Sequence, residues 1–127
     1  MLFCKNKKLP FIHPFDDPLV IAGQGTIGKE LLDQFDENID IVFVAVGGGG
    51  LISGIGAYIK SVKPKIKIIA VEAADAAGLN ASLKADKRIK LQEVGLFADG
   101  AAAKQIGKHN YKLIKEWIDD SITCLLY

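Results

Sequence analysis

Long apolar runs and a strong net charge are both missing from this sequence of 127 residues. No uncharged apolar run is long enough to cross a bilayer, and the N-terminal MLFCKNKKLP lacks the apolar stretch of a signal peptide. The formal net charge of +1 gives no electrostatic basis for binding nucleic acid or an anionic membrane. We therefore expect a cytoplasmic protein that binds neither.

Side chains that commonly carry chemistry are also scarce. Cys4 and Cys124 are far apart and belong to no ligand or redox spacing, so we expect both to be reduced. We expect His13 to pack or cap and His109 to be solvated near a helix start. No His, Asp or Glu residues have metal-ligand spacing, so no metal site is predicted. Ser53 lacks the glycines of a nucleophile elbow.

The composition is that of one globular domain, with 50% hydrophobic and 24% charged residues. Strand and helix patterns alternate, which predicts an α/β fold: a parallel sheet flanked by helices. Strands are expected at 40–46, 67–72 and 121–125, and helices at 18–35, 51–62, 76–84 and 109–119, with a short helix after residue 94. The strand at 40–46 is apolar on both faces, which is typical of the interior of a parallel sheet.

Glycines interrupt the first helix and fill the turn after the first strand. Gly23, Gly25 and Gly28 weaken the helix, which indicates that another segment packs closely against it. The turn is IVFVAV followed by Gly47–Gly50, and a helix follows at once. Unpaired N–H groups and the helix dipole make such a turn an anion site, and glycine lets the backbone curl around a phosphate.

The residues of this turn leave the identity of the anion open. No Lys or Arg lies between Gly47 and Tyr58, so backbone groups would hold a phosphate, and the Gly-Lys-Ser/Thr ending of a P-loop is missing. Gly48, Gly50 and Ser53 come within one residue of a dinucleotide fingerprint, with Glu72 placed to meet a ribose. A phosphate cofactor of another kind is equally compatible. The remaining alternative is a tight turn without a ligand, which explains four glycines poorly.

Further segments resemble a known family. HPFDDPLVIAGQGTIGKELL, DIVFVAVGGGGLISGI, IKIIAVEAADAAGL, EVGLFADGAAAKQIG and DDSIT occur in the order found in threonine dehydratases, which are fold-type II pyridoxal phosphate (PLP) enzymes. The resemblance runs from Phe11 to Thr123. It implies that residues 11–127 are part of a PLP-dependent catalytic domain, and that residues 1–10 are an extension outside the resemblance.

The resemblance assigns the glycine turn to the cofactor phosphate. It implies that Gly47, Gly48, Gly49, Gly50 and the Leu51 amide form the phosphate cradle. The loop ending at Gly100 would pass close to the cofactor ring, although it is also compatible with an ordinary helix-entry turn. In related serine racemases, the residues that match Glu72 and Gly78 are carboxylates that coordinate a cation; Gly78 removes one of them here, so no metal is expected.

The family chemistry is the PLP-dependent conversion of L-threonine to 2-oxobutanoate and ammonia, with serine giving pyruvate. Family members usually assemble, so a homo-oligomer is the expected form. The lysine that forms a Schiff base with PLP lies in a Ser-x-Lys-x-Arg-Gly-type motif, which MLFCKNKKLP lacks. Lys5, Lys7 and Lys8 are not assigned to that role, and no catalytic residue is predicted.

Two alternatives to an active dehydratase remain. The chain could be a noncatalytic PLP- or phosphate-binding remnant, cut short at both ends, or else a nucleotide-binding module. Missing neighbours would leave sheet edges unpaired and apolar surface exposed, so we also expect low solubility of the isolated chain.

Overall fold

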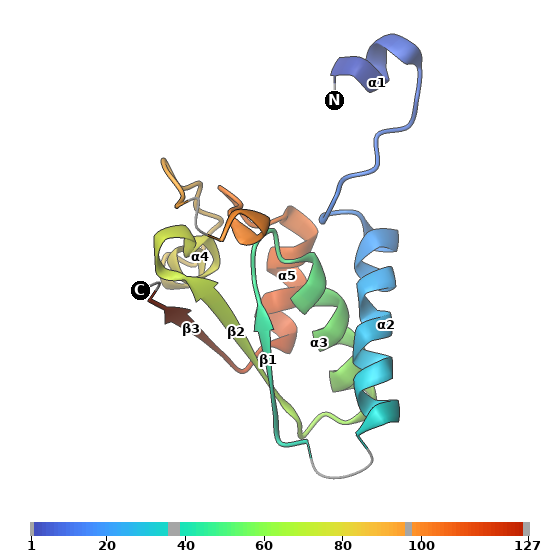
Figure 1. Cartoon of the computed structure of the whole chain (residues 1–127), viewed down its shortest axis with the longest axis vertical. Coiled ribbons are helices and arrows are strands. Elements are labelled where there is room, and N and C mark those ends of the chain that lie inside the picture. Colours follow the sequence, from blue (N-terminus) through green and yellow to red (C-terminus); the bar gives the residue numbers. More distant parts are fainter. Residues whose placement is uncertain (1, 36–38, 96–97, 126–127) are drawn as a thin grey trace.

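The computed structural model describes residues 2–35, 39–95 and 98–125. Within them lies a parallel sheet of three strands in the order β1–β2–β3 (Figure 1). The strands are β1 (Ile41–Ala45), β2 (Lys67–Ala73) and β3 (Asp120–Cys124). The helices are α1 (Leu2–Lys7), α2 (Pro18–Gln34), α3 (Gly50–Val62), α4 (Gly78–Lys84) and α5 (Lys108–Trp117), with short 3-10 helices η1 (Ala74–Ala76) and η2 (Asp99–Ala101). The predicted α/β architecture is confirmed.

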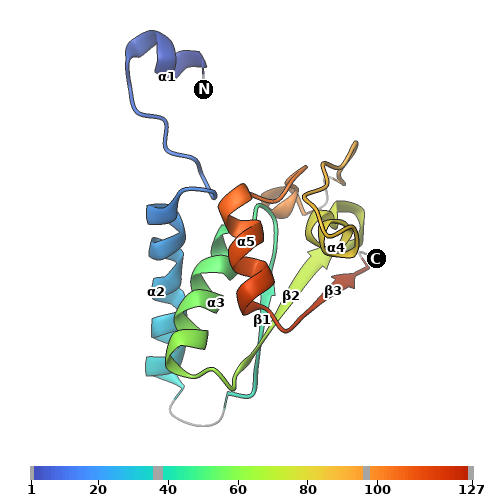
Figure 2. The same cartoon turned by 180° about the vertical axis from the view of Figure 1, so that it is seen from behind.

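The core lies between one face of the sheet and the helices α3 and α5, as the view from behind shows (Figure 2). From the strands it receives alternate residues such as Val44, Ile68 and Ala70, all nearly or fully buried. From the helices it receives Ile52, Ile55, Ile59 and Ile114. These isoleucines recur at helical spacing in the sequence, so burial of one helical face accounts for the position of α3.

On the opposite face of the sheet the side chains of β1 are exposed, which corrects the prediction that both faces of the first strand are buried. Figure 1 views this face, which none of the described helices covers. The side chain of Phe43 is 62% exposed, and Ile41 and Ile122 are also exposed. In addition, β1 lies at an edge of the described sheet and not in its interior. β1 therefore has more apolar side chains than the described residues bury.

Neighbouring residues of β1 provide a test of this asymmetry. We expect Phe43→Lys to change the free energy of unfolding by less than about 1 kcal/mol, because the side chain is exposed, and to raise the solubility of the isolated chain. Val44→Ala changes the side chain less, but Val44 is only 3% exposed, so this substitution is expected to lower the free energy of unfolding by about 2 kcal/mol. Urea unfolding followed by circular dichroism, together with light scattering, measures both effects. An equal loss of stability in the two variants would contradict the observed face assignment.

Helix α2 packs on α3 through small residues. Its start is as predicted: Pro18 is its first residue, and the Asp17 carboxylate accepts a hydrogen bond from the Leu19 N–H at 2.8 Å. Gly25 lies against Gly54 of α3, where an added Cβ would come within 3.2 Å of the Gly54 carbonyl oxygen. The close approach inferred from the helix glycines is therefore confirmed at Gly25, whereas Gly23 faces open space.

Two local predictions need correction. The helix expected over 76–84 is present as α4 but starts at Gly78, where the Glu72 carboxylate accepts the N–H groups of Leu79 and Asn80. Helix α1 falls in the N-terminal segment, for which no helix was expected; it stands apart from the other elements in Figures 1 and 2.

Candidate functional site

The glycine turn connects the carboxyl end of β1 to the first residue of α3. Val46 still bonds to the sheet, its N–H donating to the Val71 carbonyl at 2.9 Å. Gly49 precedes α3 in the left-handed conformation, with φ of 95°. Only glycine adopts this conformation readily, so the abrupt change from strand to helix depends on this residue. The first N–H groups of α3 have no partner within the helix and are available to an anion.

Three of the glycines are also required by packing. A Cβ on Gly48 would overlap the ring of Phe15. A Cβ on Gly50 would lie 2.9 Å from the Phe15 carbonyl oxygen, and one on Gly47 would lie 2.9 Å from the Ala101 carbonyl oxygen. Two segments remote in sequence therefore close over the turn, which explains why four consecutive glycines are present.

The turn borders a hollow of about 410 Å³. Its wall consists of Pro14, Phe15, Ala45, Gly47, Gly48, Gly49, Gly50, Leu51, Gly100 and Ala101. The structure thus brings all six sequence-predicted binding residues to one hollow. Among the described residues, its lining contains no ionisable side chain, so its anion-binding capacity comes from backbone N–H groups and the amino end of α3. The glycine cradle and its neutral donors fit a phosphate group.

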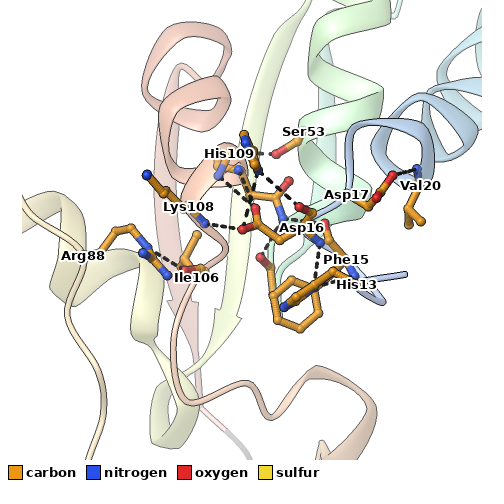
Figure 3. A network of polar contacts seen from close by, with 12 residues as sticks. His13, Phe15, Asp16, Asp17, Val20, Ser53, Arg88, Ile106, Lys108 and His109 are labelled. Carbon is orange, nitrogen blue, oxygen red and sulfur yellow. Dashed lines mark hydrogen bonds and ion pairs between the residues drawn. The ribbon is translucent and has the colours of Figure 1, made fainter. Parts of the chain in front are cut away.

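A polar network behind the turn was not foreseen from the sequence (Figure 3). The Asp16 carboxylate caps α5, accepting the N–H groups of Lys108 at 2.7 Å and His109 at 2.9 Å. Asp16 and Asp17 are adjacent, yet they cap two different helices. The link joins residues more than ninety positions apart, so only the Asp-Asp dipeptide itself could have suggested a second cap.

Both histidines support this network. The Nδ1 atom of His13 accepts the N–H of Asp16 at 3.0 Å, and its ring lies edge-on to Phe15 with centroids 4.5 Å apart. The expectation that His13 caps and packs is confirmed. His109 is exposed at the start of α5, as expected, and its Nδ1 is 3.2 Å from the Asp16 carbonyl oxygen.

Glu72 is buried at the end of β2, on the covered face of the sheet. Each of its carboxylate oxygens accepts a backbone N–H at 2.7 Å, from Leu79 and from Asn80. Burial raises the pKa of Glu72 above 4.5, although these two hydrogen bonds act in the opposite direction. Because Glu72 is buried and both of its oxygens bond to α4, it supports the structure and does not lie at a surface where it could meet a ribose.

The raised pKa of Glu72 predicts a pH dependence of stability. The folded state holds the proton more tightly than the unfolded state, so the contribution of Glu72 falls as the pH rises from 4.5 through the folded pKa. Relative to Glu72→Gln, the wild-type chain should therefore lose stability over this range, by at most about 1.4 kcal/mol per pH unit. Urea unfolding of both chains between about pH 4 and pH 8 measures the difference. A difference that stays constant with pH would contradict the raised pKa.

The structure also places the other residues that were considered from the sequence. Ser53 is buried in α3, and its hydroxyl donates to the Asn110 carbonyl at 3.5 Å. Cys4 and Cys124 are free thiols. In the part of the chain that is described, no three His, Cys, Asp or Glu side chains are grouped as metal ligands. None of the described helices has the length and apolar character needed to cross a bilayer.

Comparisons with known proteins place this chain in a family. The sequence model for "Pyridoxal-phosphate dependent enzyme" matches residues 2–125. L-threonine dehydratase biosynthetic IlvA of Burkholderia multivorans is 51% identical over 119 residues, which are 94% of this chain and 24% of that protein. The mitochondrial threonine dehydratase of Schizosaccharomyces pombe is 54% identical over 119 residues, 93% of this chain and 20% of that protein. The chain thus spans about a quarter or less of the length of these relatives.

The fold gives the same result. The processed form of threonine deaminase isoform 2 from Solanum lycopersicum superposes with a TM-score of 0.94 at 42% identity, covering 98% of this chain and 36% of that one. The resemblance to threonine dehydratases is therefore confirmed, together with the fold-type II class. With a family match over nearly its whole length, this chain belongs to the family of pyridoxal-phosphate-dependent enzymes.

Proposed function

We propose that this chain forms the phosphate-holding part of the cofactor site of a PLP-dependent threonine dehydratase. The observation that carries the proposal is the glycine turn, where Gly47–Leu51 and Gly100 border one hollow at the amino end of α3. Identities of 51% and 54% to threonine dehydratases support the choice of cofactor and substrate. Bound PLP would supply the electron sink for loss of the α-proton and β-hydroxyl of threonine, giving 2-oxobutanoate and ammonia.

The residues of this chain act on the phosphate and on its surroundings. Neutral N–H donors from the turn and the first turn of α3 hold the phosphate charge. The Phe15 ring packs on Gly48 and forms part of the wall beside the turn. Gly100, in the wall of the same hollow, leaves space beside the phosphate for the rest of the cofactor.

Covalent attachment of the cofactor is assigned to a lysine outside this chain. The residues of the described structure that line the hollow include no lysine, and Lys5, Lys7 and Lys8 lie in a segment without the family's lysine motif. Threonine deamination therefore requires a further polypeptide segment. By itself, the chain is proposed to bind PLP without turning over threonine, which is the remnant alternative, and an assembled homo-oligomer remains a prediction.

Some relatives are named mitochondrial or chloroplastic, so the cytoplasmic location stays a prediction. A nucleotide-binding module is disfavoured because Glu72, the acid expected to meet a ribose, is buried and bonded to α4.

A titration with pyridoxamine 5′-phosphate tests the proposal, because this probe carries the phosphate but no aldehyde that could react with surface lysines. Saturable binding by calorimetry, with much weaker binding of pyridoxamine and of NAD, is the expected result. Equal affinity for the probe with and without its phosphate would overturn the proposal. Assay of 2-oxobutanoate from threonine and PLP then separates an active chain from a noncatalytic one.

A further inference from the structure

Asn110 is a fully buried polar residue on α5 that lies behind the glycine turn. Its side-chain Nδ2 donates to the Phe15 carbonyl at 2.7 Å and to the Gly48 carbonyl at 3.0 Å. Its Oδ1 has no hydrogen-bond partner among the described residues. A buried acceptor without a partner costs about 1–3 kcal/mol, so a specific interaction of the other amide atom has to offset this cost.

The two carbonyl acceptors fix the orientation of the Asn110 amide. An NH₂ group has two hydrogens, and each can point to one of the two oxygens. In the flipped orientation, the side-chain oxygen would face two carbonyl oxygens without any donor between them. Asn110 therefore acts as a donor toward the turn.

The Gly48 carbonyl accepts a second hydrogen bond, also from the start of α5. The N–H of Gly107, the residue before α5, donates to the Gly48 carbonyl at 3.0 Å. The peptide bonds described contain no cis bond, so the N–H of Gly49 points opposite to the Gly48 carbonyl within one planar peptide group. With the carbonyl held toward α5, the Gly49 N–H is turned away from α5.

We propose that Asn110 is a positioning residue for the phosphate site: by holding the Gly48 carbonyl, it sets the direction of the Gly49 N–H that binds the phosphate. This inference rests on the proposed function of the glycine turn. A peptide between two glycines rotates more freely than others, and two donors on one carbonyl remove that freedom. The Asp16 carboxylate also accepts the Asn110 N–H at 3.2 Å, so the anchor itself is fixed.

Binding of pyridoxamine 5′-phosphate to Asn110→Ala and Asn110→Asp tests the inference. We expect each variant to bind about tenfold more weakly than the wild-type chain at pH 8, which corresponds to about 1.4 kcal/mol. Ser82→Ala is the matched control, because Ser82 is also fully buried and accepts the Ile89 N–H at 2.9 Å, away from the turn. Its affinity should match that of the wild-type chain, although its stability falls. Binding is measured below the melting temperature of each variant.

A pH series separates positioning from general destabilisation. Asn110→Asp keeps the shape of the side chain, and its carboxyl regains a donor when protonated. The affinity of Asn110→Asp relative to Asn110→Ala should therefore rise as the pH falls from about 8 to about 5, because a carboxyl facing two carbonyl oxygens is easily protonated. Titration of the ligand phosphate affects both variants equally. A ratio that does not change with pH would overturn the inference.

The wild-type chain provides a test that needs no substitution. In ¹H–¹⁵N spectra, the Gly49 amide should shift downfield when pyridoxamine 5′-phosphate is added, as should Gly50. If the probe binds but the Gly49 amide does not respond, or if Asn110→Ala binds as well as the wild-type chain, only the role of Asn110 is overturned. If the wild-type chain does not bind the probe, the proposed function is overturned as well.

Discussion

Replacement of Gly48 by aspartate is expected to weaken binding of pyridoxamine 5′-phosphate by at least about a hundredfold, which corresponds to about 2.8 kcal/mol. Two effects combine. Any side chain at Gly48 meets the ring of Phe15, so the turn or the ring has to move. A carboxylate in the wall of the hollow also repels the phosphate, at a cost of about 4 kcal/mol for unit charges about 4 Å apart at an effective dielectric constant of about 20. Calorimetric titration measures the loss.

Two further variants separate volume from charge at this position. Gly48→Asn has nearly the same size as Gly48→Asp and no charge, so the difference between their affinities reports the repulsion, which should shrink at high salt. Gly48→Ala should become better tolerated when Phe15→Ala removes the ring that a Cβ would overlap. Circular dichroism establishes that each variant is folded at the temperature of the titration. Undiminished affinity of Gly48→Asp would mean that the phosphate is not held at this turn.

The part of the site that could be predicted from sequence is the local part. β-branched apolar residues running into Gly47–Gly50, followed by the isoleucines of α3, indicate a strand, a turn and a helix from neighbouring residues alone. Helix α3 ends at Val62, just before Lys63-Pro64, for an equally local reason, because proline cannot continue a helix. The anion-binding character of the turn follows from the same short stretch. Family resemblance then selected PLP from the phosphate ligands that remained open.

The surroundings of the turn could not be predicted because they depend on contacts between remote segments. Nothing near Phe15 in the sequence indicates that its ring lies on Gly48, and nothing near Asn110 indicates that its amide holds the Gly48 carbonyl. Asp16 stands before a helix, so its local pattern suggests a cap for α2, whereas the fold uses it for α5. The exposure of one face of β1 could not be predicted either, because an apolar strand does not define which neighbours cover it.

Replacement of Gly54 by alanine is expected to cause the largest loss of stability, about 3 kcal/mol or more. An added Cβ would lie 2.6 Å from the Gly25 backbone nitrogen, and it would overlap the Ile21 carbonyl oxygen. These are backbone atoms of α2, so no side-chain rotation relieves the overlap, and the two helices have to separate. Such a loss is a large part of the total of about 5–15 kcal/mol for a typical domain. The free energy of unfolding in urea measures it.

Substitutions at two other glycines of the same helix pair should have progressively smaller effects on stability. Gly25→Ala places its Cβ 3.2 Å from the Gly54 carbonyl oxygen, so a smaller loss is expected. Gly23→Ala meets nothing within 4 Å and should raise stability by about 0.5–1 kcal/mol, since alanine favours the helix. A flat series would show that α2 and α3 are not in backbone contact. Because α2 starts two residues after Asp16, which caps α5, separation of the helices should also weaken phosphate binding in Gly54→Ala.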